Sequence, residues 1–480
     1  GYRGTLGNDK DSDWHTKFKN VNIPQNFFLA RIIGFDDEKL NIEIEILSEN
    51  RVKKGYLKNY KWARKSLSDG YVGEKITKPS QIFKTNDIIY VSHDKENLYN
   101  LQQIPKINGG IVVMDPYTGR VFALSGGFDF KLSNFNRVFQ AKRQPGSSFK
   151  PFVYMSALEN GLQPNSLILD APFVVDQGYE LGKWKPENYG KKFYGPSTLR
   201  KGVESSRNLM TIRIAQYLGM DKVTEIADRS GIMENMPPVL SMALGAGETS
   251  LIKLTAAYCS FVNGGKKIKP SLIDRIQDRR GKNIYLESYS ACANCTEPYL
   301  EELPVPQLKS LSNQIFDETK SYQMVSILKG VVDRGTGRKT KIKGIEIAGK
   351  TGTTNNNTDA WFIGFTSDLI VGVYAGFDQP ETLGKRETGS SVAVPIFKEF
   401  ISKYYEGKKI LPFTIPNGIE LIKIDYNSGK IAQGTDNSDT LYEAFSKSDN
   451  LALGNETLVG SEGFQIIEIE KNDYQEYIIY

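Results

Sequence analysis

Serine and lysine are the residues of this chain whose spacing could support covalent chemistry. Ser147 and Lys150 lie three residues apart, directly after Pro145-Gly146, and residues three apart share one face of a helix. A serine hydroxyl is a poor nucleophile until a base takes its proton. A lysine whose pKa is lowered by burial and by a nearby cation could be that base. The same spacing recurs at three places that we interpret as chance matches on solvated faces: Ser92/Lys95, Ser250/Lys253 and Ser326/Lys329.

Histidine, the usual base near neutral pH, is scarce. The chain has two, His15 and His93, and both lie in the first hundred residues. Any acid–base chemistry after residue 93 must therefore proceed without imidazole. This distribution argues against a Ser-His-Asp hydrolase and against a histidine-rich zinc enzyme over most of the chain.

Two further short segments could contribute to the same site. Ser206-Arg207-Asn208 would be interpreted as a helix cap or turn if it stood alone. Lys350-Thr351-Gly352-Thr353 ends a strand-like run, where a glycine lets another backbone or a ligand approach closely. The lysine and threonine side chains of this second segment suit a small carboxylate.

The second segment also fits a nucleotide-binding pattern. Residues 344–351 match the P-loop spacing G-x-x-x-x-G-K-[ST]. A P-loop needs a loop between its glycines and a helix after its threonine. Here the intervening residues are strand-like, and the run from Gly352 to Asn357 disfavours a helix. We therefore interpret the match as accidental.

The order of the three segments points to a known family. Ser-x-x-Lys, then Ser-x-Asn, then Lys-Thr-Gly is the order found in penicillin-binding proteins and serine β-lactamases. Residues 143–152 resemble the nucleophile segment of class A penicillin-binding proteins. Other segments are similar to the same family: Asn134–Arg137, Gly245–Glu248, Gly335–Gly337, Lys350–Thr354 and Asp359–Phe362.

This resemblance runs from about Gly110 to Phe400, and the first hundred residues resemble the OB-like insert of class A proteins from many Gram-negative bacteria. The chain departs from the pattern in two ways. Its middle segment is Ser-Arg-Asn, where β-lactamases usually carry Ser-Asp-Asn, which fits a synthetic enzyme better. The glycosyltransferase domain that precedes this region in class A proteins is absent, so we expect a fragment or processed form of a longer protein.

The resemblance implies catalytic roles for four residues. Ser147 would attack the carbonyl between the last two D-alanines of a peptidoglycan stem peptide, and Lys150 would accept the serine proton. Ser206 would relay a proton to the leaving D-alanine. Lys350 would supply positive charge that keeps Lys150 neutral.

It also implies how the substrate is held. Asn208 would bind the substrate backbone. The hydroxyls of Thr351 and Thr353, on either side of Gly352, would bind the terminal carboxylate. The backbone N–H groups of Ser147 and Thr353 would form an oxyanion hole, where loss of one donor typically costs about 10²–10³ in rate.

The implied reaction is a D,D-transpeptidation in which the acyl group passes to an amine of a neighbouring stem peptide. β-Lactam antibiotics would mimic the donor and trap Ser147. The alternatives are a D,D-carboxypeptidase or β-lactamase, with water as acceptor, and a penicillin-sensing module that acylates without turnover. No metal or organic cofactor is implied. We expect a glycosyltransferase domain and a membrane anchor in the full-length protein, on the periplasmic side of the inner membrane, and the oligomeric state is left open.

The composition is that of an ordinary globular protein, with 39% hydrophobic and 24% charged residues. A formal charge of +5 on 480 residues lacks the concentrated basic stripe of a nucleic-acid binder. The longest apolar runs are strand-length, too short to span a membrane. The length indicates two or three domains.

We place these domains at residues 1–105 (a small β-rich, OB-like domain), 106–412 (the transpeptidase domain) and 413–480 (a β hairpin with a flexible polar tail). Leu40–Leu47 alternates apolar and polar residues, as a half-buried strand does. In the second domain, strands then helices then strands predict an α+β fold. The expected elements there are a hairpin at 110–115 and 120–124, helices within 149–262 and 322–332, and strands at 345–354, 360–366 and 369–378.

The last hairpin is predicted from Ile419–Asp425 and Lys430–Ala432, with a mobile stretch from Thr435 to Thr457.

The cysteines carry less information. Cys292 and Cys295 have no second pair and no nearby histidine, which argues against zinc. A local disulfide and two free thiols both remain open, and we expect Cys259 to be packed in the core.

Overall fold

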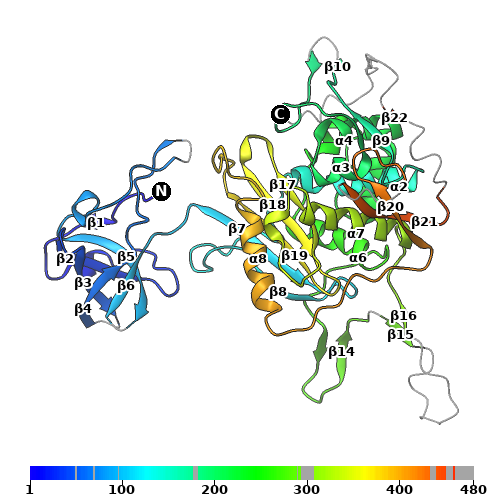
Figure 1. The fold of residues 1–480 in the computed structure, drawn as a ribbon. Coiled ribbons are helices and arrows are strands. Elements are labelled where there is room, and N and C mark those ends of the chain that lie inside the picture. The colour runs from blue at the N-terminus through cyan, green and yellow to red at the C-terminus, as the bar shows by residue number, and fades with distance from the viewer. Residues whose placement is uncertain are drawn as a thin grey trace.

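The computed structural model describes residues 1–48, 51–68, 71–95, 97–176, 182–288, 290–292, 308–432, 439–449 and 458–459. Within these ranges the chain forms a small barrel and a larger body of mixed helices and strands (Figure 1). The predicted α+β class is confirmed. None of the helices in the described ranges is both long and apolar enough to cross a membrane.

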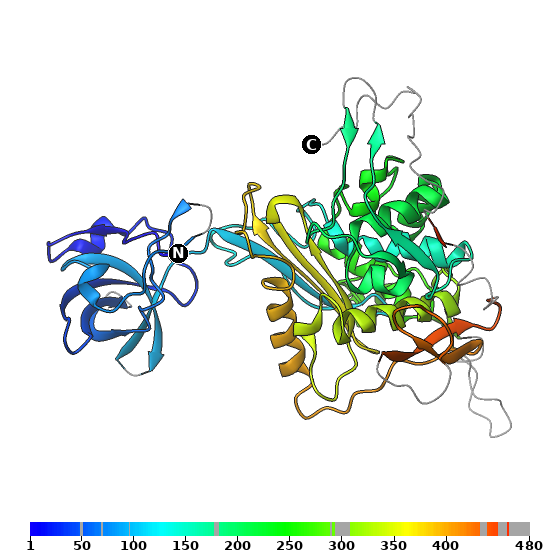
Figure 2. The same ribbon diagram turned by 45° about the horizontal axis from the view of Figure 1, so that its top comes forward.

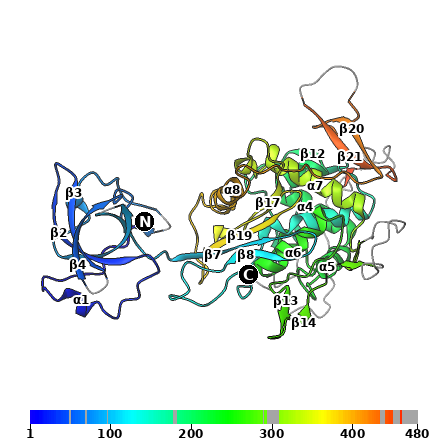
Figure 3. The ribbon, with the colours of Figure 1, turned by 90° about the horizontal axis from the view of Figure 1, so that it is seen from below.

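The N-terminal domain is a closed β-barrel. Its sheet has the order β1-β5-β2-β3-β4-β6, and β5 also pairs with β6, so that the sheet closes on itself (Figure 3). Ile42, Ile44 and Ile46 of the predicted alternating strand are fully buried inside it. The elements are β1 (Gly7–Asn8), α1 (Trp14–Lys17), β2 (Phe28–Asp36), β3 (Asn41–Ser48), β4 (Arg51–Lys58), β5 (Asp87–Lys95) and β6 (Leu98–Gln102).

The second domain is built around a five-stranded antiparallel sheet. Its order is β17-β18-β19-β7-β8, so strands from both ends of the segment meet in one sheet. The predicted hairpin and the three predicted later strands are all present. They are β7 (Ile107–Met114), β8 (Val121–Ser125), β17 (Ala348–Thr353), β18 (Asp359–Phe365) and β19 (Ile370–Phe377).

Helices cover both faces of this sheet (Figure 2). α8 (Ala393–Tyr404) packs on one face, where Phe397 meets Phe362 with ring centroids 4.8 Å apart. The other face carries α6 and α7 and, beyond them, the rest of the helical layer. These helices are α2 (Lys150–Glu159), α3 (Leu199–Glu204), α4 (Asn208–Leu218), α5 (Met220–Ser230), α6 (Leu251–Val262) and α7 (Glu318–Asp333).

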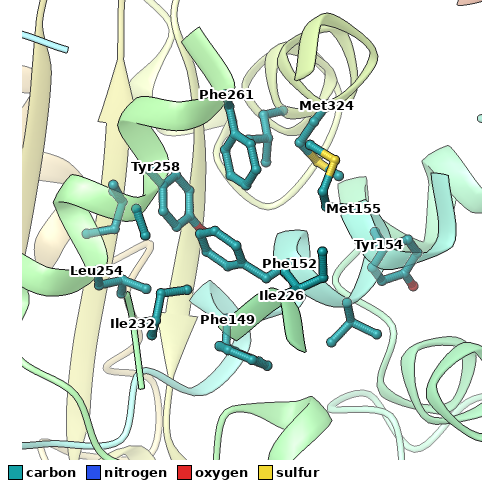
Figure 4. Packing of buried hydrophobic residues seen from close by; sticks show 14 of the residues in the cluster. Phe149, Phe152, Tyr154, Met155, Ile226, Ile232, Leu254, Tyr258, Phe261 and Met324 are labelled. Atoms are coloured by element: carbon teal, nitrogen blue, oxygen red, sulfur yellow. The ribbon is translucent and has the colours of Figure 1, made fainter. Parts of the chain in front are cut away.

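Aromatic side chains fill the centre of the helical layer (Figure 4). Phe152 of α2 contacts Tyr258 and Phe261 of α6, with ring centroids 5.3 and 5.0 Å apart. All three are buried, as is Cys259, which confirms that this cysteine is a core residue. Because α2 begins three residues after Ser147, this core fixes the nucleophile segment in place.

The second domain also contains several short strands outside its central sheet. β9 (Leu167–Asp170), β12 (Gly195–Thr198) and β22 (Leu458–Val459) form one small sheet. The others form two-stranded pairs: β10 (Val175–Asp176) with β11 (Lys183–Trp184), β13 (Arg275–Gln277) with β14 (Asn283–Leu286), and β15 (Ser290–Cys292) with β16 (Leu308–Ser310).

The last hairpin differs from the predicted one. β20 (Ile419–Asp425) pairs along its length with β21 (Thr440–Ser446), whereas Ile431 makes only an isolated bridge to Ile424. The expected mobile stretch therefore contains a strand. It forms because Ala444 and Phe445 are buried and because Glu443, also buried, meets Arg200 of α3.

Candidate active site

Ser147 lies in a 3₁₀ turn, η3 (Gly146–Ser148), that leads into α2. Its side chain is only half-buried, whereas the next serine, Ser148, is fully buried and donates its hydroxyl to the Pro145 carbonyl at 2.7 Å. Gly146 has φ = +51°, a conformation that favours glycine. Of the two adjacent serines, Ser147 is therefore the one whose hydroxyl is available to a ligand.

Lys150 is completely buried one turn further on. Its Nζ donates hydrogen bonds to the Ser206 carbonyl at 2.7 Å and to Asn208 Oδ1 at 2.6 Å, and it lies 3.4 Å from Ser206 Oγ. Burial, followed by the charge of Lys350, lowers the pKa of Lys150 well below its usual value. The described residues show no hydrogen bond from Lys150 Nζ to Ser147 Oγ, so the proton transfer between them stays a prediction.

Lys350 approaches the same serine from the sheet. Its Nζ donates to Ser206 Oγ at 2.8 Å and to the Thr351 carbonyl at 3.1 Å. Burial lowers the pKa of Lys350 to about 7. The Ser206 hydroxyl thus lies between two buried amines. These are the three residues that the sequence predicted as relay, base and electrostatic partner.

Ser206 is positioned by the turn between α3 and α4. It has φ = +55°, which is uncommon for a residue with a side chain. The start of α4 is capped by Asn188, whose Oδ1 accepts the backbone N–H groups of Asn208 at 2.9 Å and Leu209 at 3.3 Å. Asn188 is itself held by a 2.7 Å bond from its Nδ2 to Asp170 Oδ1.

Sequence reasoning missed Asn188 and Asp170. Asn188 caps a helix that begins 20 residues later, so no local spacing signals its role. Asp170 also pairs with Arg207 at 3.2 Å, inside the Ser-Arg-Asn segment. The middle residue of that segment therefore has a structural partner.

The Asn208 amide contacts the proposed base. Its Oδ1 accepts from Lys150, and its Nδ2 donates to the Glu187 carbonyl at 2.7 Å. Both ends of the amide therefore have partners in the unliganded chain. The predicted hydrogen bond to a substrate backbone stays a prediction.

The edge strand β17 packs directly on the nucleophile turn. A Cβ added to Gly352 would lie 2.4 Å from the Pro145 carbonyl oxygen, and one added to Gly146 would lie 2.6 Å from the Thr353 carbonyl oxygen. The glycines therefore allow two backbones to touch. This contact brings Ser147 and Thr353, the two predicted oxyanion donors, to neighbouring positions.

The predicted carboxylate-binding hydroxyls have partners of their own. Thr351 Oγ1 lies 2.9 Å from Thr336 Oγ1, and Thr353 Oγ1 accepts the Gly389 N–H at 3.0 Å. Thr336 belongs to the Gly335–Gly337 segment, which thereby supports β17. At the end of the neighbouring strand, Asp359 pairs with Arg143 at 3.0 Å, four residues before Ser147.

The structure also bears on the other interpretations of these segments: a P-loop, a metal site and a disulfide. Only the single 3₁₀ turn η6 (Asn355–Asn357) follows β17, so the helix that a P-loop needs after its threonine does not form here. The strand predicted at 345–354 is shorter than expected, because β17 begins at Ala348 and Ile345 makes only an isolated bridge to Ile342. In the described ranges no group of histidine, cysteine and acidic residues could hold a metal ion. Cys295 and the side chain of Cys292 lie outside the described residues, so neither the disulfide nor the two free thiols is tested.

Comparison with family models gives two matches. The model described as penicillin-binding protein transpeptidase domain matches residues 109–402, and the one described as penicillin-binding protein OB-like domain matches residues 3–107. The chain is 39% identical to penicillin-binding protein 1A of Rickettsia conorii over its whole length. It is 36% identical to penicillin-binding protein 1A of Pseudomonas aeruginosa over 84% of the chain. It spans only 58% and 52% of these relatives' own lengths.

A solved structure is similar over most of the molecule. The chain superimposes on penicillin-binding protein 1A from Haemophilus influenzae with a TM-score of 0.76 at 27% identity, covering 94% of this chain and 68% of the other. A Mycobacterium tuberculosis protein solved in complex with penicillin V shares the fold at 22% identity, with a TM-score of 0.55, over 70% of this chain.

Proposed function

The chain belongs to the penicillin-binding protein family, with an OB-like domain before its transpeptidase domain, and on that basis we propose that it is an acyl-serine D,D-transpeptidase that cross-links peptidoglycan stem peptides. The observation that carries this proposal is the placing of the Ser206 hydroxyl between two buried lysines. Nζ of Lys350 lies 2.8 Å from it and Nζ of Lys150 lies 3.4 Å from it. Such an arrangement can move a proton without histidine.

Acylation follows from these positions. Ser147 Oγ attacks the carbonyl carbon between the two terminal D-alanines while its proton passes to neutral Lys150. The N–H groups of Ser147 and Thr353 stabilise the oxyanion. The C–N bond then breaks, and the departing D-alanine amine takes a proton delivered through Ser206 from Lys150.

Deacylation repeats the steps in reverse with a new nucleophile. An amine of a neighbouring stem peptide attacks the ester, its proton passes to Lys150, and the ester C–O bond breaks. Ser147 recovers its proton and a new peptide bond remains. With water as the nucleophile, the same site would act as a carboxypeptidase. We propose an amine as the acceptor.

Substrate binding is assigned to two elements, the start of α4 and the strand β17. Asn208 binds the donor backbone, and the hydroxyls of Thr351 and Thr353 bind the terminal carboxylate across Gly352. Support comes from the close backbone contact between β17 and the Ser147 turn at Gly352. β-Lactams are proposed to occupy the donor position, as a relative of the same fold was solved with penicillin V.

We place the enzyme at the periplasmic face of the bacterial inner membrane, within a longer protein that carries a glycosyltransferase domain and a membrane anchor. The relatives' greater lengths support this, since the chain spans 58% of the Rickettsia conorii protein. Its partners are then stem peptides and β-lactams.

Labelling with a fluorescent penicillin tests the proposal. We expect one labelled peptide, which contains Ser147, and we expect Ser147→Ala to abolish the label. Ser92→Ala is the matched control, because Ser92 begins the same Ser-x-x-Lys spacing in the barrel and accepts a hydrogen bond from Gln102 there. A folded chain that takes up no label, or a label that survives in Ser147→Ala, would contradict the acyl-serine mechanism.

A further inference from the structure

Three exposed aromatic side chains lie in a loop that contacts the Ser-Arg-Asn segment. Tyr189, Phe193 and Tyr194, here called the aromatic rim, have 74%, 51% and 55% of their surfaces exposed. They belong to the loop that follows β11, next to the hairpin β10–β11 that projects at the upper edge of the molecule (Figure 1). Three large aromatic side chains that are each more than half exposed, all within residues 189–194, indicate an interaction surface.

This loop is fastened to the Ser-Arg-Asn segment at both ends of the rim. On one side, the Glu187 carbonyl accepts from Asn208 Nδ2 at 2.7 Å. On the other, the ring of Tyr194 stacks on Arg207, with the guanidinium carbon 3.9 Å from the ring centroid. Asn188 joins the two sides, because its Nδ2 also donates to the Lys192 carbonyl at 2.9 Å. The rim therefore has a fixed position beside the Ser-Arg-Asn segment.

Strand β11 and the loop that follows it are basic. Lys183, Lys185 and Lys192 are exposed, and within the described part of the chain none of them forms an ion pair. Lys191 has one weak contact, 3.8 Å to the exposed carboxylate of Glu187. A ligand for this surface should therefore combine flat apolar faces with negative charge.

We propose that the aromatic rim and its lysines bind an uncross-linked peptidoglycan strand beside the reacting stem peptide. The C–H faces of the pyranose rings pack on the aromatic rings, and the lysines pair with free carboxylates of the stem peptides. This inference rests on the proposed transpeptidase function and adds to it. The enzyme recognises the polymer as well as the dipeptide that it cleaves.

The experiment compares polymer binding with acylation. Fluorescently labelled soluble strands, not cross-linked, are titrated with the wild type and with Tyr189→Ser/Phe193→Ser, and acylation by a small fluorescent penicillin is timed in parallel. Tyr194 is left intact because it contacts Arg207. We expect strand affinity to fall about tenfold, or about 1.4 kcal/mol, while the acylation rate changes less than about twofold. Lys183→Gln/Lys185→Gln should weaken strand binding and reduce its salt dependence.

The matched control is Phe130→Ser/Tyr442→Ser, which removes two aromatic side chains that are 81% and 68% exposed and lie outside this loop. Strand affinity that is unchanged in the rim variant, or that falls equally in the control, overturns the inference. Equal losses of strand affinity and acylation rate also overturn it, because the loop would then act only by positioning the Ser-Arg-Asn segment. A wild-type chain that fails to acylate overturns the proposed function itself, a result distinct from normal acylation with unchanged strand affinity.

Discussion

Two buried amines meet at one hydroxyl in this site, and the charge of Lys350 affects Lys150. Lys150 and Lys350 both have pKa values below the usual lysine value, chiefly because burial penalises the charged form. The charge of Lys350 lowers the pKa of Lys150 further. A lysine can then act as a base near neutral pH, where a solvated lysine is protonated.

The pH dependence of acylation tests this arrangement. Because the pKa of Lys350 is about 7, its positive charge is lost as the pH rises through that value. We therefore expect the second-order rate constant of acylation by penicillin, which reports the free enzyme, to fall on the alkaline side. Lys350→Arg keeps the charge at every accessible pH, so its profile should lack this alkaline fall even if its maximum is lower.

Stopped-flow acylation between about pH 5 and 10 would measure both profiles. Lys253→Arg provides the control, since Lys253 is half-exposed on α6 and occupies the chance Ser-x-x-Lys match. An alkaline fall that persists unchanged in Lys350→Arg would assign the titration to another group.

The positions of Ser147 and Lys350 depend on a close contact between the elements that carry them, η3 and β17. β17 and η3 touch backbone to backbone at Gly352, so an added methyl group has no space there. We expect Gly352→Ala to separate the strand from the nucleophile turn, to lower stability by about 1–3 kcal/mol, and to slow acylation much more than that loss alone would. Gly34→Ala is the control, because an added Cβ there meets nothing within 4 Å. Thermal unfolding and penicillin labelling of both variants measure the outcome, and normal labelling of Gly352→Ala would refute the tight-contact argument.

A buried ion pair fastens the last hairpin to the helical layer. Arg200 of α3 is 2% exposed, Glu443 of β21 is fully buried, and the guanidinium forms two hydrogen bonds with the carboxylate. Glu443→Leu leaves the arginine charge buried beside Glu204, a carboxylate that Arg200 shares with Arg334, and we expect a loss of about 3–5 kcal/mol. Arg200→Leu/Glu443→Leu should lose less than the sum of the single changes. Urea unfolding in a double-mutant cycle gives the coupling, and additive losses would show that the pair is not coupled.

These contacts explain which parts of the structure were predictable. Strand β3 was visible because Ile42, Ile44 and Ile46 alternate with polar residues, and the catalytic segments were visible because their order along the chain is distinctive. β21 was missed because its neighbours are polar and its buried Glu443 looks like a surface residue until Arg200 is placed beside it. Asn188 was missed for a similar reason, since its partners are distant in sequence.

At the scale of the whole molecule, the barrel and the transpeptidase body have separate hydrophobic cores. Few contacts join them among the described residues. The Gln25 N–H donates to Asp129 Oδ2 at 2.7 Å, and the rings of Phe27 and Phe128 lie 5.9 Å apart. Because the contacts between them are few, we expect the two domains to unfold independently.

Calorimetry of the intact chain should therefore show two thermal transitions. A penicillin that acylates Ser147 contacts only the transpeptidase body, so it should raise the midpoint of that transition and leave the barrel transition in place. Ser147→Ala provides the control, since the drug should then shift neither transition. A single cooperative transition that moves as a whole would show instead that the two bodies are energetically coupled, and the barrel would then be part of the machinery that stabilises the catalytic site.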